Sequence, residues 1–196
     1  MLAGGLGATA VFFRGWRLAA ESIELANTQI QAQAKLQGVL DATGHAAGRS
    51  GKQLFEMANA MQEASTLGDE EIIGAMAKMA TFKNVQGKVF DDAIQAALDL
   101  AHVGFGSIEQ ASVQMGKALE DPVQGVSALK RVGVSIMADD QKRITALYEQ
   151  GRLIEAQQVL LKAVKDQVDG VAAGVAATDA GKLQIINNKL NDKIGR

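Results

Sequence analysis

The segment MGKALEDPVQGVSALKRVGVS, Met115 to Ser135, contains the only proline of the chain, Pro122, directly after Asp121. An aspartate before a helix can accept hydrogen bonds from the free N–H groups of its first turn. A proline at the first helical position gives up an N–H group that would have no partner there. The pair therefore predicts a helix that begins at Pro122.

The helix predicted after Pro122 has one apolar face. Its members recur every three residues: Val123, Val126, Leu129 and Val132. This spacing is typical of a helix that packs on a core, so we expect Leu129 and Val132 to be buried within one chain. Gly133 is placed to end the helix.

Further helices are predicted on both sides of this one. Ser107 and Gln110 form a Ser-x-x-Gln capping box before a short helix. Asp139 and Asp140 precede another, which Gly151 ends. The segment thus predicts three short helices joined by tight connections.

Three stretches carry a resemblance to a known family: TLGDEEIIGAMAKMATFKNVQGKVFDDAIQAALDLA (66–101), GKALEDPVQGVSALKRVGVS (116–135) and LYEQGRLIEAQQVLL (147–161). Together they closely resemble part of the prophage tail length tape measure proteins of long-tailed bacteriophages. The residues that carry the shared motif are Gly116, Lys117, Ala118, Leu119, Asp121, Pro122, Gly125, Leu129, Arg131, Gly133, Val134 and Gln141.

The resemblance implies a structural protein of the virion tail, made in the host cytoplasm during assembly. A helical polypeptide of this family lies in the lumen of the tail tube, and its length fixes where the tube stops growing. The implied partners are tail tube and tail tip proteins and tail assembly chaperones. One alternative is a membrane-acting or host-injected helical module that contacts the host membrane during DNA delivery. A second is a stand-alone helical adaptor.

Composition restricts the class of protein. Apolar residues make up 47% of the chain and aromatic residues only 4%, so the core must be built mainly of aliphatic side chains and methionine. The 20 basic and 22 acidic residues form no long run of either sign, which argues against a specific nucleic-acid surface. These features, and the lack of any stretch typical of a β-strand, predict an all-α fold: a multi-helix bundle of short helices preceded by a long helix.

The long helix is predicted from about Arg17 to Asp41, where no proline and few glycines occur. Its apolar stripe is narrow and otherwise surrounded by glutamines. Such a helix gains by packing against copies of itself in a coiled coil, as a trimer or hexamer. The residues predicted to mediate self-association are Ile23, Ala26, Ile30, Leu36 and Leu40. The alternative is a helix that lies back along its own domain.

Four regions are predicted along the chain. Residues 1–15 form an apolar, Gly/Ala-rich lead, which we expect to lie inside a longer polypeptide because the family's proteins are much longer. Its apolar run of 12 residues, 2–13, falls short of the roughly 20 needed to span a bilayer as a helix. Residues 16–43 form the long helix, residues 50–168 the helical bundle with the family motif, and residues 169–196 an Ala/Gly-rich helical tail.

No pattern typical of catalysis or of cofactor or metal binding was found. The chain has no cysteine, and its two histidines, His45 and His102, have no second ligand at a suitable spacing. Acidic pairs such as Glu70 and Glu71 or Asp91 and Asp92 fall in predicted first helical turns, where carboxylates are favoured. We therefore expect no enzyme activity, no cofactor and no metal site.

Overall fold

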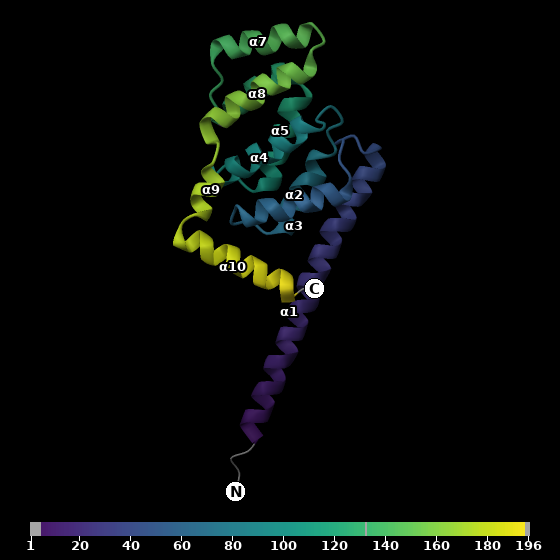
Figure 1. The fold of residues 1–196 in the computed structure, drawn as a ribbon, viewed down its shortest axis with the longest axis vertical. Helices are drawn as coiled ribbons and strands as arrows, with labels where there is room; N and C mark the ends of the chain where they lie inside the picture. The colour runs from purple at the N-terminus through teal and green to yellow at the C-terminus, as the bar shows by residue number, and fades with distance from the viewer. Residues whose placement is uncertain (1–4, 132, 195–196) are drawn as a thin grey trace.

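The computed structural model describes residues 5–131 and 133–194, with side chains described from residue 23 onward; Val132 lies outside the described residues (Figure 1). The described residues form ten helices and no strand, so the prediction of an all-α fold is confirmed. The helices are α1 (Gly5–Thr43), α2 (Gly51–Glu63), α3 (Asp69–Met79), α4 (Lys88–Val103), α5 (Ile108–Glu120), α6 (Pro122–Arg131), α7 (Ala138–Glu149), α8 (Leu153–Val168), α9 (Val171–Ala176) and α10 (Asp179–Ile194).

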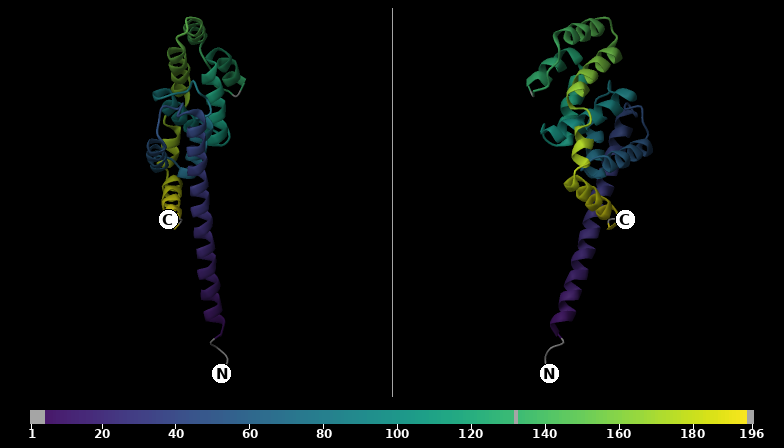
Figure 2. Two further views of the ribbon diagram at one scale, coloured as in Figure 1. Left: turned by 90° about the vertical axis from the view of Figure 1, so that its right-hand side faces the viewer. Right: turned by 60° about the vertical axis from the view of Figure 1, so that its left-hand side comes forward.

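The first helix, α1, is longer than the sequence predicted. It runs unbroken for 39 residues from Gly5, through the region expected to be an apolar lead before a helix at about Arg17. No proline interrupts this region, and its Ala, Leu and Phe residues tolerate helical geometry. The C-terminal half of α1 lies along the body formed by α2 to α10, and its N-terminal half projects beyond that body (Figures 1 and 2).

The centre of the body is α3, which packs against α1, α2 and α5. Most of its side chains are buried, including Ile72, Ile73, Met76 and Met79. The helix begins as the sequence indicates, because Gly68 is its N-cap and the Glu71 side chain accepts a hydrogen bond from the Gly68 N–H at 3.1 Å. A helix buried on almost every side fixes the elements around it, so α3 sets the position of both α1 and α5.

The capping signals at Asp121 and Ser107 are confirmed, whereas Asp139 and Asp140, expected to precede a helix, lie inside the first turn of α7, whose N-cap is Met137. The Asp121 carboxylate accepts a hydrogen bond from the Gln124 N–H at 3.1 Å, and α6 begins at Pro122. The Ser107 capping box is also present. After α6, Gly133 takes φ 97°, a left-handed conformation that suits glycine. Local sequence thus determined where these helices begin and end.

Two motif glycines allow close packing around α5. A Cβ on Gly125, in α6, would lie 2.3 Å from the Ala118 carbonyl oxygen, and a Cβ on Gly116 would lie 2.2 Å from the Phe82 ring. Leu129, on α6, is buried as predicted, and Val126 on the same helix is buried too, while the prediction for Val132 falls outside the described residues. The motif therefore encodes close helix packing.

The helices α7 and α8 form a hairpin at the end of the body away from the N-terminus (Figure 1). Gly151, at φ 72°, makes the turn between them. The α8 helix continues along α4 and leads to α9, whose second residue, Ala172, donates its N–H to the Asp99 carboxylate at 2.9 Å. The predicted helical tail is thus two helices, α9 and α10.

Within the part of the chain that the structure describes, none of the helices is both long enough and apolar enough to cross a bilayer.

Candidate functional site

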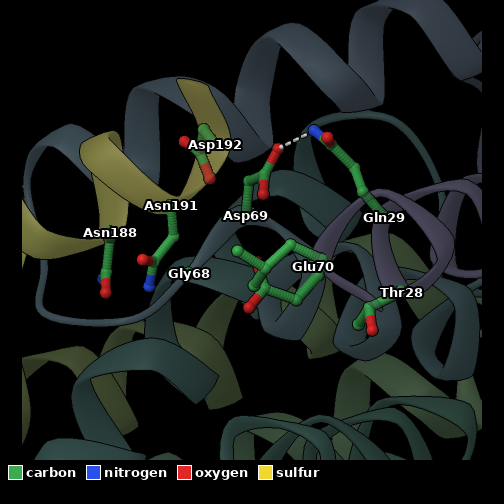
Figure 3. A pocket seen from close by; sticks show the side chains of 9 residues that line it. Thr28, Gln29, Gly68, Asp69, Glu70, Asn188, Asn191 and Asp192 are labelled. Atoms are coloured by element: carbon green, nitrogen blue, oxygen red, sulfur yellow. Dashed lines mark hydrogen bonds between the residues drawn. The ribbon is translucent and has the colours of Figure 1, made fainter. Parts of the chain in front are cut away.

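The helices α1, α3 and α10 meet around a small cavity of about 40 Å³ (Figure 3). The cavity is lined by Leu25, Thr28, Gln29, Gly68, Asp69, Glu70, Asn188, Asn191 and Asp192. Most of these side chains are polar, and they come from three elements far apart in the sequence. A volume of this size has room for about one water molecule, so it is a polar junction between helices and not a substrate pocket.

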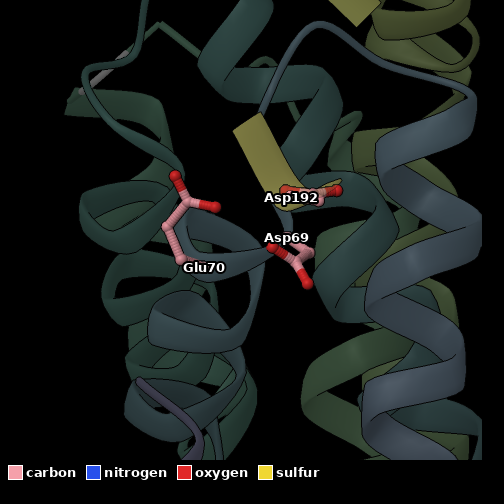
Figure 4. A group of neighbouring side chains, drawn as sticks. All are labelled: Asp69, Glu70 and Asp192. Atoms are coloured by element: carbon pink, nitrogen blue, oxygen red, sulfur yellow. The ribbon is translucent and has the colours of Figure 1, made fainter. Parts of the chain in front are cut away.

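Three carboxylates meet at this junction: Asp69, Glu70 and Asp192 each bring an oxygen to within 4.8 Å of the others (Figure 4). Asp69 is 3% exposed and accepts a hydrogen bond from the Gln29 side-chain amide at 3.1 Å. Asp192 accepts one from the Gln62 amide at 2.9 Å. The amides of Gln29 and Gln62 thus satisfy part of the cluster without a cation.

Glu70 is the member of the cluster whose titration is perturbed. Burial raises the pKa of its carboxyl, a hydrogen bond from its own backbone N–H opposes this, and Asp69 adds to the rise. Asp69 and Glu70 lie in the first turn of α3, where the helix dipole favours carboxylates; the sequence predicted this for Glu70 and Glu71. Asp192 was not foreseen, because no local pattern places residue 192 beside residue 69. Carboxylate oxygens are ligands for hard cations, yet the helix dipole already accounts for two of the three, because Asp69 and Glu70 lie in the first turn of α3.

The last helix, α10, packs with its polar side toward the body. The Asn188 side chain donates to the Thr66 carbonyl at 3.0 Å, and Lys189 lies 3.2 Å from Glu63. Within the described span of α10, Gly181 is the only buried residue. A Cβ there would lie 2.3 Å from the Val175 carbonyl oxygen. The α10 helix is therefore held by one close backbone approach and a few polar contacts.

The other side of α10 is apolar and exposed. We call it the α10 stripe, and it consists of Leu183, Ile186, Leu190 and Ile194, which are 69%, 62%, 53% and 39% exposed. Residues three, four and four apart fall on one face of a helix, so these four side chains form a continuous strip. This stripe was not predicted from the sequence, although its spacing is visible in LQIINNKLNDKI, residues 183–194.

The α1 helix also has an outer apolar face, which we call the α1 stripe: Ile23, Ala26, Ile30 and Ala34. Ile23 is 63% exposed and Ile30 62% exposed, whereas Ala26 is half-buried and Ala34 exposed. Two other residues predicted to mediate self-association, Leu36 and Leu40, are fully buried in the core of their own chain. Their placement on one stripe with Ile30 is corrected, because both are buried in the core, on the face of α1 opposite Ile30.

The motif residues are mostly packing residues. Ala118, Leu119, Pro122 and Val134 are buried, and the Gln141 side chain donates to the Ile136 carbonyl at 2.6 Å. Near them, a groove of about 250 Å³ is lined by Gln114, Lys117, Ala128, Leu129 and Arg131. Its lining contains no carboxylate, histidine or hydroxyl group that could act as a general base or nucleophile.

A buried glutamine lies near the motif. Gln157, on α8, is fully buried and donates to the carbonyls of Asn84 and Leu119, both at 2.9 Å. It joins three parts of the chain far apart in sequence. Its amide oxygen has no hydrogen-bond partner among the described residues. Its role is to connect α8 to α5 and to the loop before α4.

A family model described as prophage tail length tape measure protein matches residues 6–136. This match extends from α1 to the segment before α7 and includes most of the motif. No curated protein matches the chain. No solved structure matches it either.

Proposed function

Because this chain belongs to the prophage tail length tape measure protein family, whose members are structural proteins of the virion tail, we propose that it helps to set tail length. In this proposal the chain lies in the lumen of the tail tube while tube subunits polymerise around it. Polymerisation stops where the helical polypeptide ends. The family gives the tail as its location and other tail components as its partners.

The observation that supports this role is the geometry of α1. It is a continuous helix of 39 residues, and part of it projects from the body with no other described element beside it (Figure 2). An α-helix rises about 1.5 Å per residue, so α1 spans about 58 Å. A projecting helix converts residue number into distance, which is what a ruler requires.

The body has a different role in this proposal. The helices α2 to α10 fold back on one another, so adding residues to the body does not lengthen it in proportion. We infer that the body is an end structure, which docks to the tail tip or to assembly chaperones. The projecting half of α1 then points along the tube.

We also propose that copies of the chain associate through the outer face of α1, as a trimer or hexamer around the tail axis. Ile23 and Ile30 are exposed on this face, and Ala26 lies between them. Leu36 and Leu40 take no part, since the core of their own chain covers them. We expect Ile30→Asp to abolish association without unfolding the chain, measured by light scattering coupled to size exclusion.

The length hypothesis is tested with an insertion in the phage. Inserting about 72 helix-forming residues before Ile23 adds about 20 full turns and about 108 Å to α1 without rotating its stripe. We expect virion tails to lengthen by that amount, to within one ring of the tube, in electron micrographs.

A matched insertion tests whether position matters. The same number of Gly/Ser residues placed in the exposed turn at 150–152, between α7 and α8, should leave tail length unchanged. Tails that lengthen equally with both insertions would contradict a helical ruler in α1. Tails that lengthen with neither would contradict a role in length.

A further inference from the structure

The stripes of α1 and α10 share one spacing. Both place their four members at positions i, i+3, i+7 and i+11, so each forms a straight strip of about three turns. Both face away from the body, because the opposite faces of the two helices line the polar junction of Figure 3. Among the described residues, the structure therefore leaves two apolar strips of equal length without a partner in the same chain.

We propose that the α10 stripe packs against the α1 stripe of a neighbouring copy of this chain. This inference rests on the association through α1 proposed above and names what covers α1 in the neighbour. The contact joins two different surfaces, so each copy uses its α1 stripe toward one neighbour and its α10 stripe toward the other. Heterologous contacts form a ring when the rotation from copy to copy closes, which is what a trimer or hexamer requires.

Side-chain size favours this pairing over α1 against α1. The α1 stripe alternates large and small residues, Ile23 and Ile30 with Ala26 and Ala34, whereas all four members of the α10 stripe are leucine or isoleucine. If two α1 stripes packed in parallel register, alanine would face alanine at two of the four positions. The contact would be poorly filled at those two positions. The α10 stripe supplies a large side chain opposite each alanine, whichever way the two helices run.

Charge disfavours α10 against α10. Lys182, Lys189 and Lys193 lie along one flank of the α10 stripe, and Asp192 is the only acid among residues 182–194. Two α10 helices side by side would bring lysine rows together. Residues 23–34 of α1 contain one acid, Glu24, and no basic residue. The lysine-flanked α10 stripe therefore meets no like charge within residues 23–34 of α1.

The size of a stable interface also favours an assembly that uses both stripes. A stable interface engages roughly 20–30 residues on each side, far more than one strip of four. A ring in which every copy uses both strips covers both apolar faces and holds each copy by two neighbours. An assembly through α1 alone would leave the more apolar strip in water.

Three isoleucines with equal exposure provide matched variants. Ile30 on α1, Ile186 on α10 and Ile154 on α8 are each 62% exposed, so replacing any of them by glutamine leaves the core intact. We expect Ile30→Gln and Ile186→Gln each to weaken association about tenfold, because each removes one isoleucine buried at every contact. Ile154→Gln should leave the solution mass unchanged. Light scattering over a concentration series measures all three.

Cross-linking identifies the paired surfaces directly. The chain has no cysteine, so single-cysteine variants report one position each. The variants Ile30→Cys and Ile186→Cys are mixed, allowed to exchange subunits and treated with a short bifunctional thiol reagent that reaches across one helical turn, about 5.4 Å. We expect the yield of cross-links between Ile30→Cys and Ile186→Cys to exceed the yield of cross-links within either variant. Ile154→Cys mixed with Ile30→Cys should give no excess.

The outcomes separate the two proposals. If Ile30→Gln weakens association while Ile186→Gln does not, or if Ile30→Cys links only to itself, the α10 contact is overturned and association through α1 remains. If the wild-type chain is a monomer at every concentration, association through α1 fails and the α10 contact fails with it. Loss of association in Ile154→Gln as well would mean that neither stripe is specific.

Discussion

Replacing Gly125 by alanine tests the packing of α5 and α6 most directly. The added Cβ would lie 2.3 Å from the Ala118 carbonyl oxygen and 2.6 Å from its Cα. Ordinary contacts begin at 3.4 Å, so α6 would have to move about 1 Å away from α5. The obstructing atoms belong to the backbone of a helix and cannot rotate away, unlike the Phe82 ring that Gly116 faces.

The expected effect follows from two opposing contributions. Overpacking a core costs about 1–3 kcal/mol, and a backbone clash belongs at the upper end of that range. Alanine gains about 1 kcal/mol over glycine in helix propensity. The net destabilisation is therefore about 2 kcal/mol, which corresponds to a fall in Tm of roughly 4–8 °C for a domain of this size.

The matched control is Gly38→Ala. Gly38 is also helical, in α1, and a Cβ there would have nothing within 4 Å. The same chemical change should therefore stabilise the chain by about 0.5–1 kcal/mol. Thermal and urea unfolding followed by far-ultraviolet circular dichroism measures both variants. If Gly125→Ala proved as stable as Gly38→Ala, the motif glycine would not be a packing residue and our account of the motif would be wrong.

Three further changes probe the core, the buried amide and the carboxylate cluster. Leu129→Asp places a charge at a buried position and should unfold the chain, whereas Leu183→Asp, at a position 69% exposed, should leave circular dichroism unchanged. Gln157→Leu deprives two carbonyls of their donor and should cost about 1–3 kcal/mol in urea unfolding. Glu70 has a raised pKa in the folded state, so its ionisation opposes folding as the pH rises above the unfolded pKa of 4.5. Glu70→Gln should therefore raise the free energy of unfolding at pH 7. This gain should vanish below pH 4.5.

Helix boundaries were predictable because their causes are local. Asp121, Ser50 and Ser107 cap helices through groups three residues away, and left-handed glycines such as Gly133 and Gly151 follow the helix ends. Each of these signals is contained within four or five residues of sequence. The all-α fold followed from such signals together with helical periodicity.

The contacts between distant segments were not predictable. The Asp99 carboxylate caps α9 from 73 residues away, and Asp192 joins the first turn of α3 although no local pattern links them. The dependence on distant contacts also explains why Leu36 and Leu40 were wrongly assigned to the self-association face of α1. Periodicity showed that Ile30 and Leu36 belong to apolar positions, but only the placement of α3 decides that Leu36 faces the core and Ile30 faces outward.

The exposure of the α10 stripe indicates that the chain gains stability by assembling with other copies. Completing the burial of its four side chains would contribute on the order of 4 kcal/mol, at about 2 kcal/mol for each fully buried leucine or isoleucine. That is comparable to the whole net stability of many domains, which is about 5–15 kcal/mol. The body could have gained this energy by turning α10 over, yet α10 packs through Asn188 and Lys189 and leaves Leu183 and Ile186 outside. A chain that faces its apolar side outward on two helices has the surface of an assembly subunit, so we expect concentration to raise its Tm.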